Sequence, residues 1–169
     1  MKKLAIIPFI LLFGCASTGG PKWADNPKCK KRVHCAVGIA ETDIRAVSVT
    51  QATKMALAEI TTLIESDNDV RSETAIETAG RDAGLFFQQV SRTQASVMLR
   101  DLKASRQETS RKGRYYTAYV LLEVDKGALR ERELEELQKN DEIYQKLSGT
   151  KLIDEMKAEM NEYRKSKGK

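Results

Sequence analysis

Residues 115–124 form the segment that most constrains what this chain can fold into, because apolar side chains dominate alternate positions along it. One predicted face is entirely apolar and consists of Tyr116, Ala118, Val120, Leu122 and Val124. Such alternation predicts a β-strand with one side buried. The preceding Lys112-Gly113 pair is a turn signal, so residues 102–110 are predicted to be the partner strand of a hairpin. A sheet with one apolar face needs a second layer of structure to cover it.

Two segments with helical periodicity can supply that second layer. In residues 44–64, apolar residues and alanines recur at spacings of three and four, which predicts a helix that ends near Asp67-Asn68. Its small alanine side chains favour a close approach to a sheet. Residues 82–96 predict a second helix with phenylalanine and valine on one face.

Two further strands are predicted from shorter alternating segments. Residues 32–40 alternate clearly, whereas residues 70–78 alternate only weakly. The predicted order is therefore β-α-β-α-β-β, followed by helices. We expect the α+β fold class, with helices packed on one face of a mainly antiparallel sheet.

The composition changes after this predicted sheet. Eleven basic and eleven acidic residues lie between Asp125 and Lys169, with no proline. This mixture predicts a long, charged surface helix that is broken at Ser148-Gly149-Thr150. The second part carries a narrow apolar stripe made of Leu152, Met156, Met160 and Tyr163. Such a stripe is expected to dock on its own domain or on a second copy of the chain.

The N-terminus has the features of an export signal. Lys2 and Lys3 precede the apolar run 4–13, which is shorter than the ~20 residues that a membrane-spanning helix needs. The run leads into Leu12-Phe13-Gly14-Cys15, which resembles the lipobox of bacterial lipoproteins. That resemblance implies cleavage before Cys15 and attachment of several acyl chains to it, which gives stable membrane anchoring. The alternative is an ordinary secretory signal with a chance cysteine.

The residue after the cysteine indicates which membrane would hold the lipid. Position 16 is Ala rather than Asp, and in lipoproteins of Gram-negative bacteria Asp is the usual signal for retention in the inner membrane. The resemblance therefore implies the outer membrane, with the chain on its periplasmic face.

Cleavage would also change the charge balance of the 169-residue chain. Loss of residues 1–14 removes two of the 29 basic residues and none of the 24 acidic ones, so the net charge falls from +5 to +3. No nucleic-acid partner is expected for this modest charge. Two basic runs remain, Lys28–Arg32 and Arg111–Arg114. They are interpreted as solvated, with anionic lipid or cell-wall polymer as the alternative ligand.

These features divide the chain into four parts. We predict a signal peptide at 1–14, a lipidated tether at 15–31, an α+β domain at 32–125 and a charged helical tail at 126–169. Within the tether, Pro21-Lys22-Trp23 is expected to be turn-like rather than helical. Trp23 is expected to pack on the domain edge or to lie at a partner surface.

Few residues suggest chemistry. Cys29 and Cys35 are candidates for a disulfide, because export leads to an oxidising compartment; two free thiols, with Cys35 buried, are the alternative. His34 is the single histidine and is expected to be an exposed strand residue. Together with the two cysteines it supplies three ligands where structural zinc needs four, so no metal site is expected. We predict no catalytic residues and no cofactor, because a nucleophile needs a positioned base and no phosphate-binding loop stands in the chain.

The order of segments resembles the LPP20-type family of bacterial lipoproteins. The resemblance covers residues 21–126 and rests on Pro21-Lys22-Trp23, on Ala36-Val37-Gly38-Ile39-Ala40 before the alanine-containing helix, on Val90-Ser91 and on the stretch from Tyr115-Tyr116 to Asp125-Lys126. It implies a lipoprotein of the outer membrane with no established catalytic residues. We expect a non-enzymatic component of the envelope that acts by self-association or protein contacts. The alternatives are a periplasmic binding module for peptidoglycan or an envelope enzyme, and a component of a flagellar disk beneath the outer membrane.

Overall fold

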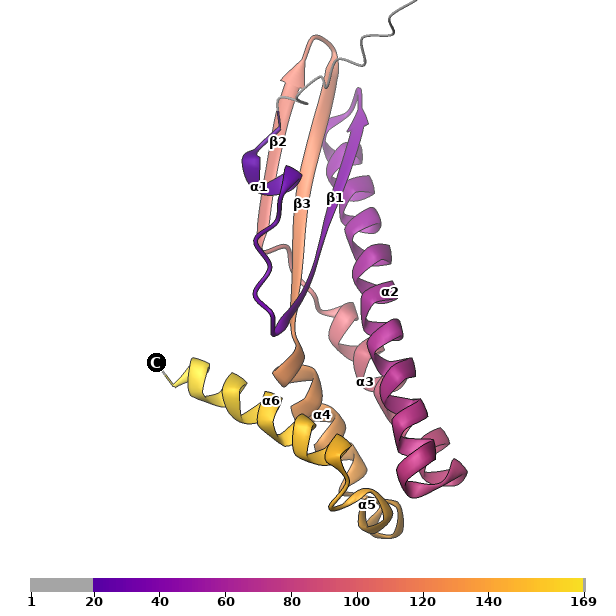
Figure 1. Ribbon diagram of the computed structural model, residues 1–169. Coiled ribbons are helices and arrows are strands. Elements are labelled where there is room, and N and C mark those ends of the chain that lie inside the picture. Colours follow the sequence, from indigo (N-terminus) through magenta and orange to yellow (C-terminus); the bar gives the residue numbers. More distant parts are fainter. Residues whose placement is uncertain (1–19, 169) are drawn as a thin grey trace, which may run out of the picture.

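The computed structural model describes residues 20–168 (Figure 1) and confirms the α+β class. Its sheet is antiparallel, with three strands in the order β1-β3-β2. The strands are β1 (Val33–Thr42), β2 (Arg106–Lys112) and β3 (Tyr115–Asp125). The helices are α1 (Lys22–Asp25), α2 (Arg45–Ala79), α3 (Arg81–Arg100), α4 (Lys126–Leu137), α5 (Asp141–Leu147) and α6 (Lys151–Lys167). Cys15 and the predicted signal peptide lie outside the described residues.

The predicted hairpin is confirmed, and its second strand is the centre of the sheet. β3 pairs with β2 on one side and with β1 on the other. The predicted apolar face of β3 is turned toward α2, and Ala118, Val120, Leu122 and Val124 on it are buried. Tyr116, near the end of the strand, is half-buried.

The first strand packs on α2 through small residues. A side chain at Gly38 would collide with the backbone carbonyl of Ala52, so the two elements approach more closely than any larger residue permits. Ala52 and Ala56 are fully buried at this contact. The close approach of the alanine-containing helix to the sheet agrees with the sequence prediction.

α2 is much longer than predicted. The weak strand predicted at 70–78 and the helix end predicted at Asp67-Asn68 are both wrong, because α2 continues to Ala79. Its buried positions recur every four residues (Ser48, Ala52, Ala56, Ile60, Ile64, Asn68 and Ser72). A spacing of four drifts slowly around a helix with 3.6 residues per turn. The buried side of α2 therefore faces the sheet in the first part of the helix and the other helices in the last part. Buried residues of the last part include the polar Asn68 and Ser72, so the apolar periodicity that predicts a helix is absent there.

The predicted tail is built into the fold instead of lying on its surface. Asp125, Asn140 and Thr150 cap the starts of α4, α5 and α6 by accepting hydrogen bonds from backbone N–H groups. The predicted break at 148–150 separates α5 from α6, and a second break follows Leu137. Residues of all three helices join α2 and α3 in a second hydrophobic core, whose buried members are Ala75, Ala83, Phe87, Val90, Leu134, Leu137, Leu147, Leu152, Ile153 and Met156. Contacts therefore cross the predicted division at residues 125 and 126.

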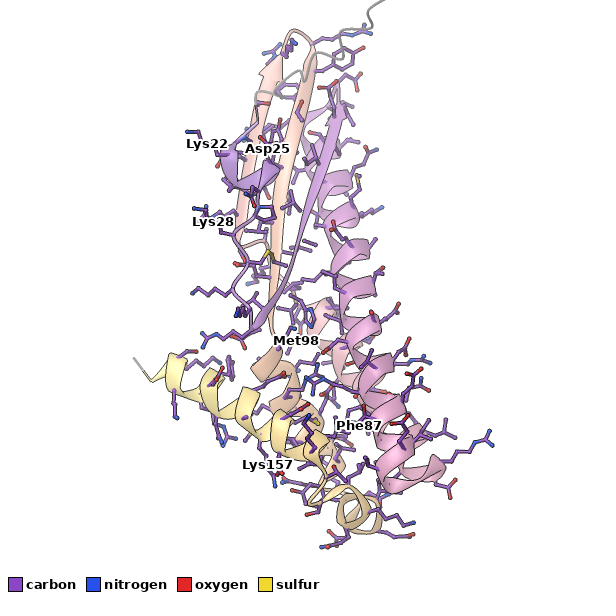
Figure 2. The ribbon with its side chains drawn as sticks, in the orientation of Figure 1. Lys22, Asp25, Lys28, Phe87, Met98 and Lys157 are labelled. Atoms are coloured by element: carbon purple, nitrogen blue, oxygen red, sulfur yellow. A yellow bond between two sulfur atoms is a disulfide. The ribbon has the colours of Figure 1, made fainter. Side chains whose placement is uncertain are left out.

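The segment before β1 covers the other face of the sheet. α1 is helical, contrary to the expectation for Pro21-Lys22-Trp23, and Trp23 donates a hydrogen bond from Nε1 to Glu108 on β2 at 2.6 Å. Tyr119 and Leu121, on the outer side of β3, are buried. Lys22 and Lys28 point away from the sheet on this side (Figure 2). The predicted tether is thus a packed layer from residue 20 onward.

Candidate functional site

The structure brings the two predicted disulfide partners together. Cys29, before β1, and Cys35, within β1, are in disulfide contact, and their Cα atoms lie 6.1 Å apart. This separation is within the range that a disulfide spans. Peptide mass mapping without reductant remains the measurement that decides whether the bond forms in the exported protein.

His34 is not an exposed strand residue, as the sequence suggested, because only 8% of it is exposed. Position 34 belongs to the face of β1 that is turned toward α2, next to Val124 of β3. Its Nε2 lies 3.7 Å from Oδ2 of Asp67 on α2. The face of β1 that packs on α2 carries His34 together with the small residues Ala36, Gly38 and Ala40, so α2 covers the histidine as well.

Asp67 belongs to a cluster of charged side chains between the sheet and the C-terminal helices. We define the buried charge cluster as Asp67 and Arg71 of α2, Arg130 and Glu133 of α4, and Glu159 of α6. Arg130 and Glu133 are completely buried. The cluster lies where α2 leaves the sheet and meets α4 and α6.

Arg130 is the centre of this cluster. Its guanidinium forms ion pairs with Asp67, with Glu133 at 2.6 Å and with Glu159 at 3.2 Å. It also donates a hydrogen bond to Oδ1 of Asn68 at 3.4 Å. Arg71 completes the network through an ion pair with the other carboxylate oxygen of Glu159, at 2.8 Å. One arginine thus connects α4 to both α2 and α6.

A glycine makes this connection possible. A side chain at Gly127 would collide with the backbone of Glu159 and with Tyr163, so α4 and α6 lie in close contact there. Glu159 therefore comes within reach of Arg130, one turn along α4.

The surroundings shift the pKa values of the cluster in different directions. Burial alone would raise the pKa of Asp67, but the neighbouring His34 and the charges of Arg130 and Arg71 together hold that pKa well below its usual range. Burial raises the pKa of Glu133, and the charge of Arg130 opposes this only in part. For Arg130, burial would lower the pKa, but Glu133 and Asp67 outweigh it and raise the pKa. Asp67 and Arg130 are therefore both charged at neutral pH.

The paired geometry suits a structural junction. The carboxylates that surround Arg130 are engaged by arginines, and the elements joined are α2, α4 and α6, with β1 attached through His34. We interpret the cluster as the polar connection between two halves of the molecule. The sheet half consists of the three strands and the first part of α2, and the helical half consists of the rest of α2 with α4, α5 and α6. Buried ion pairs add little net stability, because the cost of desolvating the charges offsets their attraction, but removal of one partner leaves an uncompensated buried charge.

Sequence reasoning missed this cluster because it treated the charges after residue 125 as solvated. A signal was present within α4. At 3.6 residues per turn, Arg130 and Glu133 fall on the same side of the helix as Leu134 and Leu137. Charged residues inside an apolar face indicate a buried ion pair.

The strand register separates the two basic runs. Arg111, Lys112 and Arg114 lie at the turn between β2 and β3, where Thr42 of β1 pairs with Tyr116. Val33, which follows Lys28–Arg32, pairs with Asp125 at the opposite end of the sheet. The two runs thus form two distinct surfaces.

Within residues 20–168, no group of three or more His, Cys, Asp and Glu side chains is placed to hold a metal ion. None of the helices in the described part of the chain has the length and apolar character needed to cross a membrane. Comparison with protein-family models, with curated proteins and with solved structures gives no significant match for this chain.

Proposed function

We propose that this chain is a lipoprotein of the outer membrane, anchored through Cys15, that acts as a non-enzymatic component of the cell envelope through self-association or protein contacts. The observation that carries the proposal is the N-terminal sequence, in which Lys2-Lys3 and an apolar run lead into Leu12-Phe13-Gly14-Cys15. The residue types match a signal that is cleaved before a lipidated cysteine. The position of Ala16 favours the outer membrane.

The fold is compatible with the proposed membership of the LPP20-type family. A strand with Ala36 and Gly38, a helix with Ala52 and Ala56 against it, and a hairpin whose second strand begins at Tyr115 occur in the order that suggested the resemblance. Both alanines serve the helix-to-sheet contact. This agreement supports the proposal through packing, independently of the lipobox.

The exposed side of α2 supports contact with a second copy of the chain. We define the α2 row as Val47, Gln51, Met55, Ala58 and Thr62, which are all exposed and uncharged. Their spacings of three and four place them on one side of the helix over four turns. None of the five residues is charged, although charged residues make up 31% of the whole chain. Rows of this spacing pair helices in coiled coils.

We expect Met55→Glu to weaken self-association without changing the fold. Met55 is 55% exposed at the middle of the α2 row, so a glutamate there stays hydrated in the monomer and becomes buried only if two rows meet. Light scattering after size exclusion would show a mass of two or more chains for the wild type and of one chain for the variant. The circular dichroism spectra of the two proteins should coincide, because the fold of each chain is unchanged.

Leu85→Glu is the matched control for this experiment. Leu85 lies on α3 and is 47% exposed, so the same charge is added at a similar exposure outside the α2 row. The mass of the Leu85→Glu variant in light scattering should equal that of the wild type. A wild type that is monomeric and that pellets with peptidoglycan would contradict self-association and would favour the binding-module function.

The proposed anchor makes a separate prediction. Cys15→Ala should abolish incorporation of labelled fatty acid in cells, because the thioether needs the cysteine sulfur, and unprocessed precursor should accumulate. Cys29→Ala is the control and should be labelled as well as the wild type. Equal labelling of the Cys15→Ala variant and the wild type would rule out the lipobox interpretation.

A further inference from the structure

One end of the molecule combines basic, aromatic and apolar side chains. We define the sheet tip as Ile44, Arg45, Arg111, Lys112, Arg114 and Tyr115. The register joins these residues, because Thr42 pairs with Tyr116, which also pairs with Arg111, and Lys112 pairs with Tyr115. The β1–α2 connection and the β2–β3 turn therefore meet at the same end of the sheet (Figure 1).

The side chains at the sheet tip are exposed. Ile44 is 56% exposed and Tyr115 is 40% exposed, and the four basic residues are exposed as well. The guanidinium of Arg114 lies over the ring of Tyr115, 4.9 Å from its centroid, and Arg111 lies over Tyr116 at 5.2 Å. These contacts hold cations and aromatic rings together. Aromatic rings and basic groups are the side chains that proteins place at the interface of a membrane with water.

Charge at this end favours an anionic ligand. The four cations of the sheet tip are accompanied by two nearby carboxylates, Glu41 and Asp43. Glu41 accepts a hydrogen bond from Thr117 at 2.8 Å and belongs to the outer side of β1. The surplus of positive charge is therefore carried by the β2–β3 turn itself, at Arg111, Lys112 and Arg114.

The chain length between Cys15 and the sheet limits which surface can meet the membrane. A side chain at Gly20 would contact the ring of Tyr119 at 2.7 Å, so the described chain begins beside the middle of β3. Five residue steps separate Gly20 from Cys15, which is a reach of about 17 Å. Tyr115 lies four residues from Tyr119 along β3, or about 14 Å, whereas Asp125 lies six residues away, or about 20 Å. The sheet tip is within reach of an anchored Cys15, whereas the far end of the sheet, where Val33 pairs with Asp125, is not.

We infer that the sheet tip lies against the anionic phospholipid surface of the membrane that holds the lipid on Cys15. This inference rests on the proposed function for the position of the anchor. The basic side chains of the β2–β3 turn meet the lipid phosphates, and Ile44 and Tyr115 enter the interfacial layer. The helical half, with α5 and α6, then points away from the membrane.

The test is binding of the mature chain, residues 15–169 with Cys15→Ala, to lipid vesicles in a sedimentation titration. Vesicles of phosphatidylcholine with phosphatidylglycerol should bind the protein, and vesicles of phosphatidylcholine alone should bind it much less. The triple variant Arg111→Gln, Lys112→Gln, Arg114→Gln should lower partitioning by roughly a hundredfold, since each basic residue near an anionic surface contributes about fivefold. Circular dichroism melts should show that the variant is folded, because the replaced side chains are exposed.

The matched control is the triple variant Lys28→Gln, Lys30→Gln, Lys31→Gln, which removes the same charge from exposed positions outside the sheet tip. It should lower partitioning by no more than about threefold. Equal loss in both variants, or equal binding to both kinds of vesicle, would overturn the inference. The inference would also be overturned if the protein bound peptidoglycan but not vesicles, and if the triple variant of Arg111, Lys112 and Arg114 abolished that binding. The protein used in this titration carries no lipid. A lack of vesicle binding is therefore a separate result from a lack of fatty-acid labelling at Cys15.

Discussion

Replacement of Arg130 with methionine should lower the free energy of unfolding by about 3–5 kcal/mol, the loss found when one partner of a buried ion pair is removed. Arg130 is fully buried and is paired with Asp67, Glu133 and Glu159. Methionine fills similar space but leaves Glu133 charged, buried and without a partner on α4. Urea denaturation followed by circular dichroism would measure the loss.

Two variants control this prediction. Arg132→Met changes an exposed arginine of the same helix and should change the free energy of unfolding by less than about 0.5 kcal/mol. Adding Glu133→Leu to Arg130→Met should recover part of the lost stability, because it removes the buried carboxylate that has lost its partner. If Arg130→Met is as stable as Arg132→Met, the buried charge cluster does not connect the helices as described.

The pH dependence of these proteins should differ in a defined direction. In the wild type, the lowered pKa of Asp67 contributes stability above the unfolded-state pKa of about 4, and this stability is lost as the pH falls toward the folded-state value. Glu133 has a raised pKa, so its charged form costs stability at neutral pH, and the cost disappears as the pH falls through the folded-state value. Without Arg130 the contribution of Asp67 shrinks and the cost of Glu133 grows. The difference in free energy of unfolding between the wild type and Arg130→Met should therefore become smaller as the pH falls from 7 to 4.

Truncation after Gly149 should unfold the protein, contrary to the expectation of a folded domain with an appended tail. The truncation removes α6 and with it Leu152, Ile153 and Met156, which are all buried in the second core. Burial of three such side chains is worth on the order of 5–9 kcal/mol. That is comparable to the whole stability of a typical domain, about 5–15 kcal/mol. The measurement is a thermal melt, which should show no cooperative transition for the truncated chain.

Truncation after Arg164 is the control. It removes only the last five residues and keeps the ion pair between Arg164 and Glu131 as well as the buried part of α6. Its melt should resemble that of the full mature chain. A cooperative melt of the chain truncated after Gly149 at the wild-type temperature would show that residues 150–169 are not needed for the fold.

The sequence by itself predicted those elements in which each face contacts only one kind of neighbour along its length. β3 has one apolar face and one short turn before it, and the first half of α2 has alanines where it meets β1. The periodicity of apolar residues and the size of the side chains are sufficient to predict these elements, because each face contacts one layer along its whole length. The same local information identified Cys15 as the proposed anchor.

Tertiary structure alone decided the second half of α2, the burial of His34 and the position of the C-terminal helices. Asn68, Ser72, Arg130 and Glu133 are polar in sequence, but all four are buried. Each of these side chains lies where α2 leaves the sheet or meets another helix. Arg130 is neutralised in part by Glu133 of the same helical turn and in part by Asp67, 63 positions away, and by Glu159. No short window of sequence contains Arg130 together with Asp67 or Glu159, so the local pattern showed only part of the counter-charge that the fold provides.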